Sequence, residues 1–128
     1  MDNKKVCDVM SATVVSINPK ANINDAINLI NANKVGSLFV KEGEEFIGIL
    51  TKTDLLKKVI LKNLDYDTTK IHTIMSEFIV TIDSEANLKE ALELMTKNQI
   101  RYLGVIVNSE IVGILSIKDV SDYFTGNM

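Results

Sequence analysis

Two short segments of the sequence place a hydroxyl side chain three residues before a carboxylate. The first is Thr51 followed by Asp54 in "GILTKTD", and the second is Ser116 followed by Asp119 in "GILSIKD". A carboxylate can accept hydrogen bonds from both hydroxyls of a cis-diol. The N-terminus of a helix offers free N–H groups and a partial positive charge to a phosphate. Each segment therefore has polar residue types that could hold a ligand.

The same spacing also has a purely structural interpretation. A hydroxyl followed three residues later by an acid forms a capping box at the start of a helix. The sequence uses related boxes elsewhere, because Asn22 is followed by Asp25 and Asn87 by Glu90. Capping and ligand binding are compatible, since a hydroxyl can cap its helix while the acid beyond it reaches a ligand.

Few other residues have types that suit catalysis or metal binding. Cys7 and His72 are the single cysteine and the single histidine, and no CxxC or HxxxH pattern accompanies them. Two such ligands are fewer than zinc requires, so no metal site is expected. The chain has no glycine-rich phosphate loop and no nucleophile paired with a base, so we do not expect an enzyme. Lys57-Lys58 and Lys62 are interpreted as a solvated helix face.

Composition limits the class of protein. The chain has 128 residues, of which 46% are hydrophobic and 24% charged, as in ordinary globular domains. Its net charge of −3 argues against general binding of nucleic acid. No apolar run approaches the roughly 20 residues needed to cross a bilayer, so no membrane insertion is expected. The first residues do not resemble a secretory signal and one cysteine cannot form an internal disulfide, so a cytoplasmic location is expected.

The sequence is an internal duplication. A shift of 65 residues aligns Val6–Ile60 with Ile71–Thr125 without a gap, and 16 of these 55 pairs are identical. Several of the other pairs exchange one aliphatic residue for another, as at Val6 and Ile71. We therefore predict two copies of one supersecondary unit, residues 1–64 and residues 65–128, joined by the polar segment Lys62–Lys70.

Each copy predicts the same order of elements: strand, helix, strand, strand, helix. The β-branched segments Thr13–Ile17 and Phe78–Ile82 favour first strands, and Asn22 and Asn87 then cap amphipathic helices. Two strands joined by a short polar turn follow in each copy, and a last helix begins near Thr51 or Ser116. A unit of about 60 residues buries little apolar surface alone. We therefore predict an α+β fold in which two β-α-β-β-α repeats pack sheet to sheet with pseudo-twofold symmetry.

Three paired motifs identify a family resemblance. They are "VMSATVVSI" with "IMSEFIVTI", "NKVGSLFV" with "NQIRYLGV", and the two segments that carry Asp54 and Asp119. Occurring twice, in order and in register, they resemble a tandem pair of CBS domains, the regulatory module named after cystathionine β-synthase and also called a Bateman module. The resemblance covers nearly the whole chain.

The resemblance implies two candidate sites for an adenine nucleotide or an S-adenosylmethionine-type ligand in a cleft between the repeats. In the first set, three polar residues face five residues of the other part of the chain: Ser116, Lys118 and Asp119 face Val14, Val15, Val35, Gly36 and Ser37. The second set has the equivalent positions of the two repeats exchanged: Thr51, Thr53 and Asp54 face Ile79, Val80, Ile100, Arg101 and Tyr102. The first set is favoured, because Gly36 and Ser37 leave room for a purine and Lys118 can meet a phosphate.

The family resemblance also implies how such a chain would act. The ligand would be regulatory rather than a required cofactor, and an effector protein would respond to a conformational or oligomeric change. A homodimer is expected, formed by packing the outer helices of each unit against a second copy. The alternative is a structural or protein-interaction module that binds no small molecule.

Overall fold

The chain forms two compact units in a computed structural model, which describes residues 4–77 and 79–126. Unit 1 combines the segment up to Val14 with the segment from Val80 onward, and unit 2 is Val15–Ile79. The chain therefore passes into unit 2 after Val14 and leaves it after Ile79. The predicted boundary between residues 64 and 65 divides the sequence repeats rather than these units, and it stays a prediction.

Unit 2 contains a three-stranded sheet in the order β1-β2-β3. Strand β1 runs parallel to β2, and β2 and β3 form an antiparallel hairpin. The elements in chain order are β1 (Ser16–Ile17), α2 (Ile23–Asn33), β2 (Ser37–Glu42), β3 (Glu45–Thr51), α3 (Lys52–Asp54), the π-helix η1 (Leu55–Ile60) and the 3₁₀-helix η2 (Ile71–Thr73).

Unit 1 repeats this topology with a sheet in the order β4-β5-β6. Strands β4 and β5 are parallel, and β5 and β6 form the hairpin. Its elements are α1 (Val6–Val9), β4 (Thr81–Asp83), α4 (Leu88–Asn98), β5 (Tyr102–Val107), β6 (Glu110–Ser116) and α5 (Ile117–Thr125). The predicted α+β class and the repeated order of strands and helices are confirmed.

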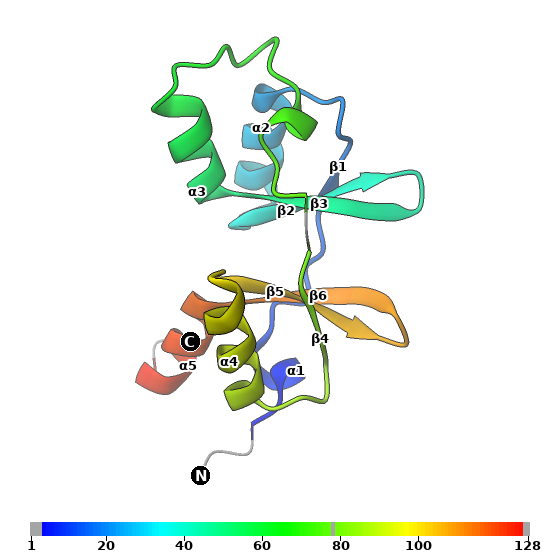
Figure 1. Cartoon of the computed structure of the whole chain (residues 1–128), viewed down its shortest axis with the longest axis vertical. Helices are drawn as coiled ribbons and strands as arrows, with labels where there is room; N and C mark the ends of the chain where they lie inside the picture. Colours follow the sequence, from blue (N-terminus) through cyan, green and yellow to red (C-terminus); the bar gives the residue numbers. More distant parts are fainter. Residues whose placement is uncertain (1–3, 78, 127–128) are drawn as a thin grey trace. The chain divides into compact units, whose positions relative to one another are not determined.

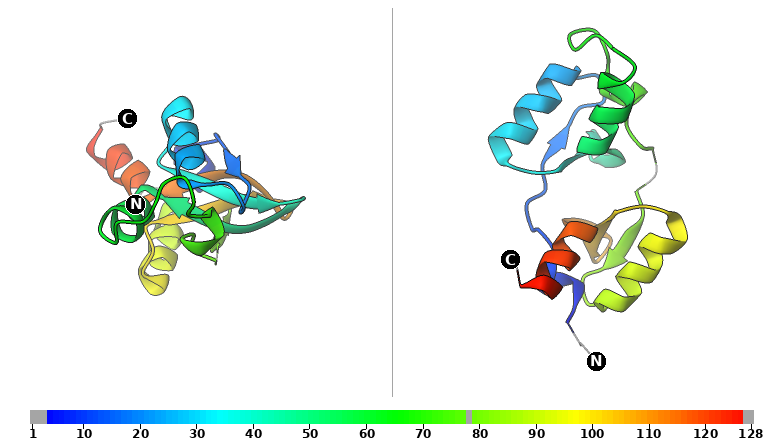
Figure 2. Two further views of the ribbon diagram at one scale, coloured as in Figure 1. Left: turned by 90° about the horizontal axis from the view of Figure 1, so that it is seen from above. Right: turned by 90° about the vertical axis from the view of Figure 1, so that its left-hand side faces the viewer.

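In each unit, the longer helices lie together on one face of the sheet (Figures 1 and 2). The helices bury the predicted apolar stripe, because Ile23, Ala26 and Ile30 of α2 are buried while Asn28 and Asn31 are exposed. Helix α4 does the same with its own set: Leu88, Ala91 and Met95. Among the described residues, no helix is long and apolar enough to span a bilayer.

The core of each unit includes two residues from the sequence repeat that forms most of the other unit. Val6 and Val9 of α1 are buried in the core of unit 1, whose other buried members lie between Ile82 and Val120. Ile71 and Ile74 take the same place in the core of unit 2. These two pairs are equivalent under the shift of 65 residues. The segment that precedes the first strand of one repeat therefore packs in the unit formed by the rest of the other repeat.

The segments that contain Ser11 and Ser76 pair with the edge strands of the two sheets, and each passes close to a glycine. Ser11 forms a bridge to Ile114 on β6, and Ser76 forms the equivalent bridge to Ile49 on β3. Both backbone hydrogen bonds of each bridge measure 2.9 Å between nitrogen and oxygen. Each bridge thus adds a further extended segment to the outer edge of its sheet, beside Gly113 or Gly48.

The first strands are shorter than the sequence predicts, and two short helices were not predicted. Strand β1 contains only Ser16 and Ile17 of the predicted Thr13–Ile17 segment. The predicted Phe78–Ile82 strand is observed from Thr81, and Phe78 lies outside the described residues. The segments before these strands instead form α1 and η2, which contain Cys7 and His72 respectively.

The two predicted caps differ in their contacts, and this gives a testable difference in stability. The side-chain oxygens of Asn22 and Asn87 accept hydrogen bonds from Asp25 N and Glu90 N, at 2.9 and 2.8 Å. Asn22 Nδ2 also donates to the backbone oxygen of Asp67, at 3.3 Å. We expect Asn87→Ala to lower the free energy of unfolding by about 1 kcal/mol. Asn22→Ala should lower it by roughly 1 kcal/mol more, because it also loses the bond to Asp67.

Urea unfolding of both alanine variants measures this difference. Asn22→Ser is the matched control, because it keeps a capping oxygen and adds no charge but lacks the amide that donates to Asp67 O. Equal losses for Asn22→Ala and Asn87→Ala would show that the bond to Asp67 contributes nothing to stability.

Candidate functional site

The Ser116–Asp119 segment lies at the N-terminus of α5. Ser116 is the N-cap, and its hydroxyl oxygen accepts a hydrogen bond from Asp119 N at 3.0 Å. Asp119 Oδ2 in turn accepts a bond from Ser116 N, also at 3.0 Å. Within residues 4–77 and 79–126, no hydrogen bond or salt bridge reaches Asp119 Oδ1. The capping box is therefore complete, and one carboxylate oxygen of the half-buried Asp119 remains available.

The Thr51–Asp54 segment forms the equivalent cap at α3, but its carboxylate is more fully engaged. Asp54 Oδ2 accepts bonds from Thr51 N at 2.9 Å and from the Thr51 hydroxyl at 3.1 Å. Asp54 Oδ1 forms a salt bridge with Lys58 Nζ at 3.3 Å. The Asp54 residue is only 9% exposed. Both oxygens of this carboxylate thus have protein partners.

The hairpins place the start of one strand beside each cap. Ser37 lies opposite Thr51 in the β2–β3 pair, and Tyr102 lies opposite Ser116 in the β5–β6 pair. The first backbone N–H group of each following helix donates a hydrogen bond to the residue just before that strand. Lys52 N donates to Gly36 O at 3.1 Å, and Ile117 N donates to Arg101 O at 2.8 Å.

The other predicted site residues are described by their backbone hydrogen bonds and their exposure within each unit. In unit 2, Val15 O accepts a bond from Phe39 N at 2.9 Å, Val35 N donates to Ile30 O, and Ile79 is half-buried. In unit 1, Val80 O accepts from Gly104 N at 2.9 Å and Ile100 N donates to Met95 O. Val14 is half-buried, and Thr53 is exposed on α3.

The structure therefore brings each hydroxyl–carboxylate pair next to residues of its own repeat. Thr51 and Asp54 lie beside Gly36 and Ser37 of unit 2. Ser116 and Asp119 lie beside Arg101 and Tyr102 of unit 1. The two sets predicted from the sequence combine residues of both units, and those sets stay predictions.

Two exposed cations flank the N-terminus of α5. Arg101 precedes β5, and Lys118 is the second residue of the helix. Lys118 Nζ bonds Asp122 Oδ2 at 2.6 Å, one turn further along α5. This hydrogen bond, together with the negative charge of Asp122, raises the pKa of Lys118 above its ordinary value. Lys118 thus places a positive charge beside the cap, although its ammonium group already has one partner.

Lys58 is a residue whose role the sequence analysis missed. It was interpreted as part of a solvated face with Lys57 and Lys62, which are indeed exposed. The interpretation is wrong for Lys58, because its ammonium group binds Asp54 Oδ1 and also donates to Ile74 O at 3.0 Å. The signal was present, since a lysine four residues after an aspartate on a helix is positioned to pair with it.

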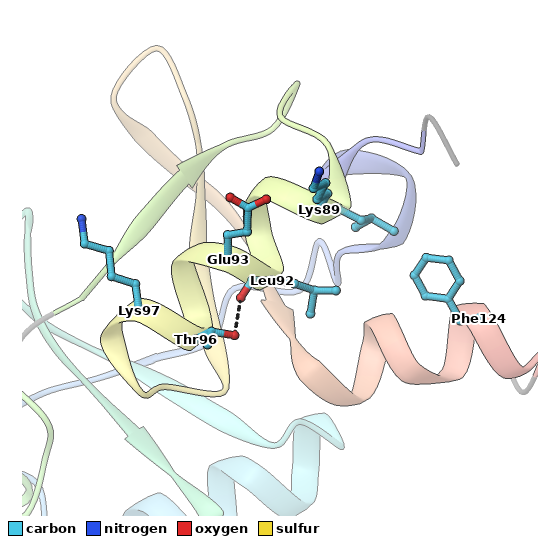
Figure 3. A pocket seen from close by; sticks show the side chains of 7 residues that line it. Lys89, Leu92, Glu93, Thr96, Lys97 and Phe124 are labelled. Carbon is cyan, nitrogen blue, oxygen red and sulfur yellow. Dashed lines mark hydrogen bonds between the residues drawn. The ribbon is translucent and has the colours of Figure 1, made fainter. Parts of the chain in front are cut away.

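Unit 1 also has an open groove between α4 and the C-terminal part of α5. Its volume is about 670 Å³, and it is lined by Leu88, Lys89, Leu92, Glu93, Thr96, Lys97 and Phe124. Figure 3 shows Leu92 on α4 and Phe124 on α5 facing the same opening. The Phe124 residue is 56% exposed, which is unusual for a side chain this large and apolar.

The described part of the chain holds no group of three or more histidine, cysteine, aspartate or glutamate residues placed to bind a metal ion. Cys7 and His72 are both exposed, and they belong to different units.

Comparison with known proteins identifies two matching segments. The model of the CBS domain matches residues 6–61 and residues 71–126. A related protein is the mitochondrial CBS domain-containing protein CBSX3 of Arabidopsis thaliana, 36% identical over 103 residues. That match covers 77% of this chain and 50% of the plant protein, so this chain spans about half the length of that relative.

Two solved structures have the same fold. One is a hexameric CBS-CP12 protein from bloom-forming cyanobacteria, with a TM-score of 0.85 and 28% identity over 95% of this chain and 73% of that one. The other is the CBS domain pair of protein MJ0100, in complex with 5′-methylthioadenosine and S-adenosyl-L-methionine. It has a TM-score of 0.84 and 21% identity, and the match covers 99% of this chain and all of that one. With two matched domains that span most of its length, the chain belongs to the CBS domain family as a tandem CBS pair.

Proposed function

We propose that this CBS pair is a regulatory module that binds an adenosine-containing ligand at the N-terminus of α5. The observation that carries the proposal is that Asp119 Oδ1, beside a capped helix end, has no protein partner in the part of the chain that the structure describes. A CBS pair of the same fold was solved with two adenosyl compounds bound, which supports this class of ligand. Adenine nucleotides and compounds of the S-adenosylmethionine type are the candidates.

The residues around this cap suit the parts of such a ligand. Asp119 Oδ1 would accept hydrogen bonds from the two ribose hydroxyls. The N-terminus of α5, with the cations Arg101 and Lys118 beside it, would favour a phosphate or another anionic group. Ile100 and Val80 of the same unit are half-buried aliphatic residues that would cover part of the adenine.

The proposed activity is binding and signalling rather than catalysis. A ligand that binds one arrangement of the protein more tightly shifts the population toward that arrangement. A partner protein that distinguishes the two arrangements would then respond to the ligand concentration.

A thermal-shift screen tests the proposal. AMP, ADP, ATP, NAD(H) and S-adenosylmethionine are added separately to the purified chain. A true ligand at 100 times its dissociation constant should stabilise the fold by about 2.7 kcal/mol. If none of these compounds stabilises the chain at millimolar concentration, ligand sensing is excluded and the interaction module is preferred.

We also propose that the chain forms a homodimer through its outer helices. Phe124 and the groove on α4 present apolar surface in unit 1, and Leu56, Ile60 and Leu61 present it in unit 2, where they are 55–79% exposed. Apolar patches of this kind on a folded protein mark interaction surfaces. The hexameric relative shows that proteins with this fold assemble.

Phe124→Asp is expected to convert this dimer to a monomer, because it places a charge in the apolar surface that a second copy would cover. Light scattering after size exclusion measures the mass of each variant. Ile117→Asp is the matched control, since Ile117 is also on α5 and 44% exposed but does not line the groove. An unchanged mass for Phe124→Asp, or a monomeric parent protein, would contradict the proposed dimer.

A further inference from the structure

We infer that Lys58 occupies the ligand position beside Asp54, so that the chain binds one ligand, at Asp119, rather than two. This inference rests on the proposed function. It adds the number of ligand sites in the chain and names Lys58 as the residue that determines this number. It comes from differences between two segments that the sequence repeat makes equivalent.

The first difference is in the carboxylates. Asp54 has a partner on each oxygen, namely Thr51 on Oδ2 and Lys58 on Oδ1. Asp119 has a partner on Oδ2 alone among the described residues. A ribose that approached Asp54 would have to displace an ammonium group from a carboxylate that is 9% exposed. Such a displacement leaves a charge without its partner, which is costly at a partly buried position.

The second difference is how firmly Lys58 is held. Besides the salt bridge at 3.3 Å, its ammonium group donates to Ile74 O at 3.0 Å. Ile74 is buried in the core of unit 2, at the end of η2. Lys58 therefore joins the helix that follows the cap to a segment that is itself fixed in the core. A surface lysine with a single acidic partner would be far easier to displace.

The third difference is in the residues at equivalent positions. Under the shift of 65 residues, Lys58 corresponds to Tyr123, and a phenol cannot form an ion pair with Asp119 at neutral pH. At the positions of Arg101 and Lys118 the other repeat has Gly36 and Thr53, and its exposed cation at the start of the helix is Lys52 instead, equivalent to Ile117. The decisive difference is therefore on the carboxylates: Asp54 holds an internal cation, whereas Asp119 Oδ1 has no partner among the described residues.

The helices that follow the two caps also differ. Asp119 lies in the first turn of α5, a regular α-helix of nine residues. Asp54 is the last residue of α3, which has three residues and continues as the π-helix η1. Lys58 lies in η1, whose winding differs from that of α5 at the equivalent residues. The two repeats therefore differ in backbone as well as in side chains at this point.

Isothermal titration with AMP, ATP and S-adenosylmethionine, each used separately, tests the inference. The parent chain should bind one equivalent of the compound that it recognises, and Asp119→Asn should weaken this binding roughly a hundredfold. Lys58→Met keeps the length and the apolar stem of the side chain but removes its charge. This variant should bind a second equivalent, and the double variant Lys58→Met with Asp119→Asn should retain one.

Lys57→Met is the matched control, because Lys57 is exposed on the same helix and should leave the single site unchanged. Two equivalents bound by the parent chain would overturn the inference while leaving the proposed function intact, and this result does not depend on whether Lys58→Met folds. One equivalent bound by a folded Lys58→Met variant, as shown by its unfolding transition, would also overturn it. No binding to any of these proteins would remove the proposed function and this inference together.

Discussion

Asp119→Asn is expected to remove most of the stabilisation that a ligand gives this chain, while leaving the fold intact. The amide has no negative charge and offers one oxygen instead of two, so it cannot bond both Ser116 N and a ribose diol. At 100 times the dissociation constant, the ligand should add about 2.7 kcal/mol to the parent chain. A hundredfold weaker site would gain only about 0.4 kcal/mol at the same concentration. Urea unfolding with and without ATP or S-adenosylmethionine measures both values.

Asp25→Asn is the matched control for this experiment. Asp25 has the same place in the capping box of α2, where its Oδ2 accepts a bond from Asn22 N at 3.2 Å. Both substitutions should therefore cost a similar amount of stability without ligand, about 1 kcal/mol or less. Only Asp119→Asn should alter the response to ligand. Full stabilisation of the Asp119→Asn variant would show that this carboxylate is only a cap.

Gly113→Ala is expected to lower the free energy of unfolding by about 2 kcal/mol. A Cβ at this position would lie 2.6 Å from the backbone oxygen of Ser11 and 2.9 Å from Met10 Sδ. The methionine can move aside, but Ser11 is held by two backbone hydrogen bonds to Ile114. The bridge between this segment and β6 would have to open to admit the methyl group. Because the segment also contributes Val6 and Val9 to the core, the loss should exceed that of an ordinary surface substitution.

Urea unfolding of Gly48→Ala should give a similar loss, since a Cβ there would lie 2.7 Å from Ser76 O. Gly36→Ala serves as the control, because a Cβ at Gly36 meets nothing within 4 Å. Its stability should stay within about 0.5 kcal/mol of the parent chain. Equal stability of Gly113→Ala and Gly36→Ala would contradict the close approach of the returning segment to β6.

Much of the fold was predictable from particular residues. Asn22 and Asn87 mark the helix starts because their side chains cap the first free N–H groups. The spacing of Ile23, Ala26 and Ile30 identifies the buried face of α2, and the structure confirms it. The gapless repeat then implies that unit 1 copies the topology of unit 2, as it does.

The exchange of segments between the units was not predictable from the same pattern. Val6 and Ile71 are equivalent apolar residues, and both are fully buried. An apolar residue that packs in its own repeat and one that packs in the other repeat produce the same periodicity. The sequence therefore shows that these residues are buried and leaves open which unit buries them.

The candidate site was predictable in its residue types and less so in its neighbours. Thr51, Asp54, Ser116 and Asp119 form the caps that their spacing indicates. Each predicted hairpin already implies that its cap lies opposite the start of the first hairpin strand, in the same repeat. The family resemblance instead directed attention to residues of the other repeat. The engagement of Lys58 depends on the position of Ile74 O, which is distant in sequence and follows from the tertiary fold.

A crystal structure of the chain grown with ATP or with S-adenosylmethionine tests the central claim most directly. The account predicts electron density for the ligand at the start of α5, with both ribose hydroxyls within hydrogen-bond distance of the Asp119 carboxylate. Density for a ligand bound elsewhere, or a chain that remains empty in crystals saturated with every stabilising compound, would contradict it.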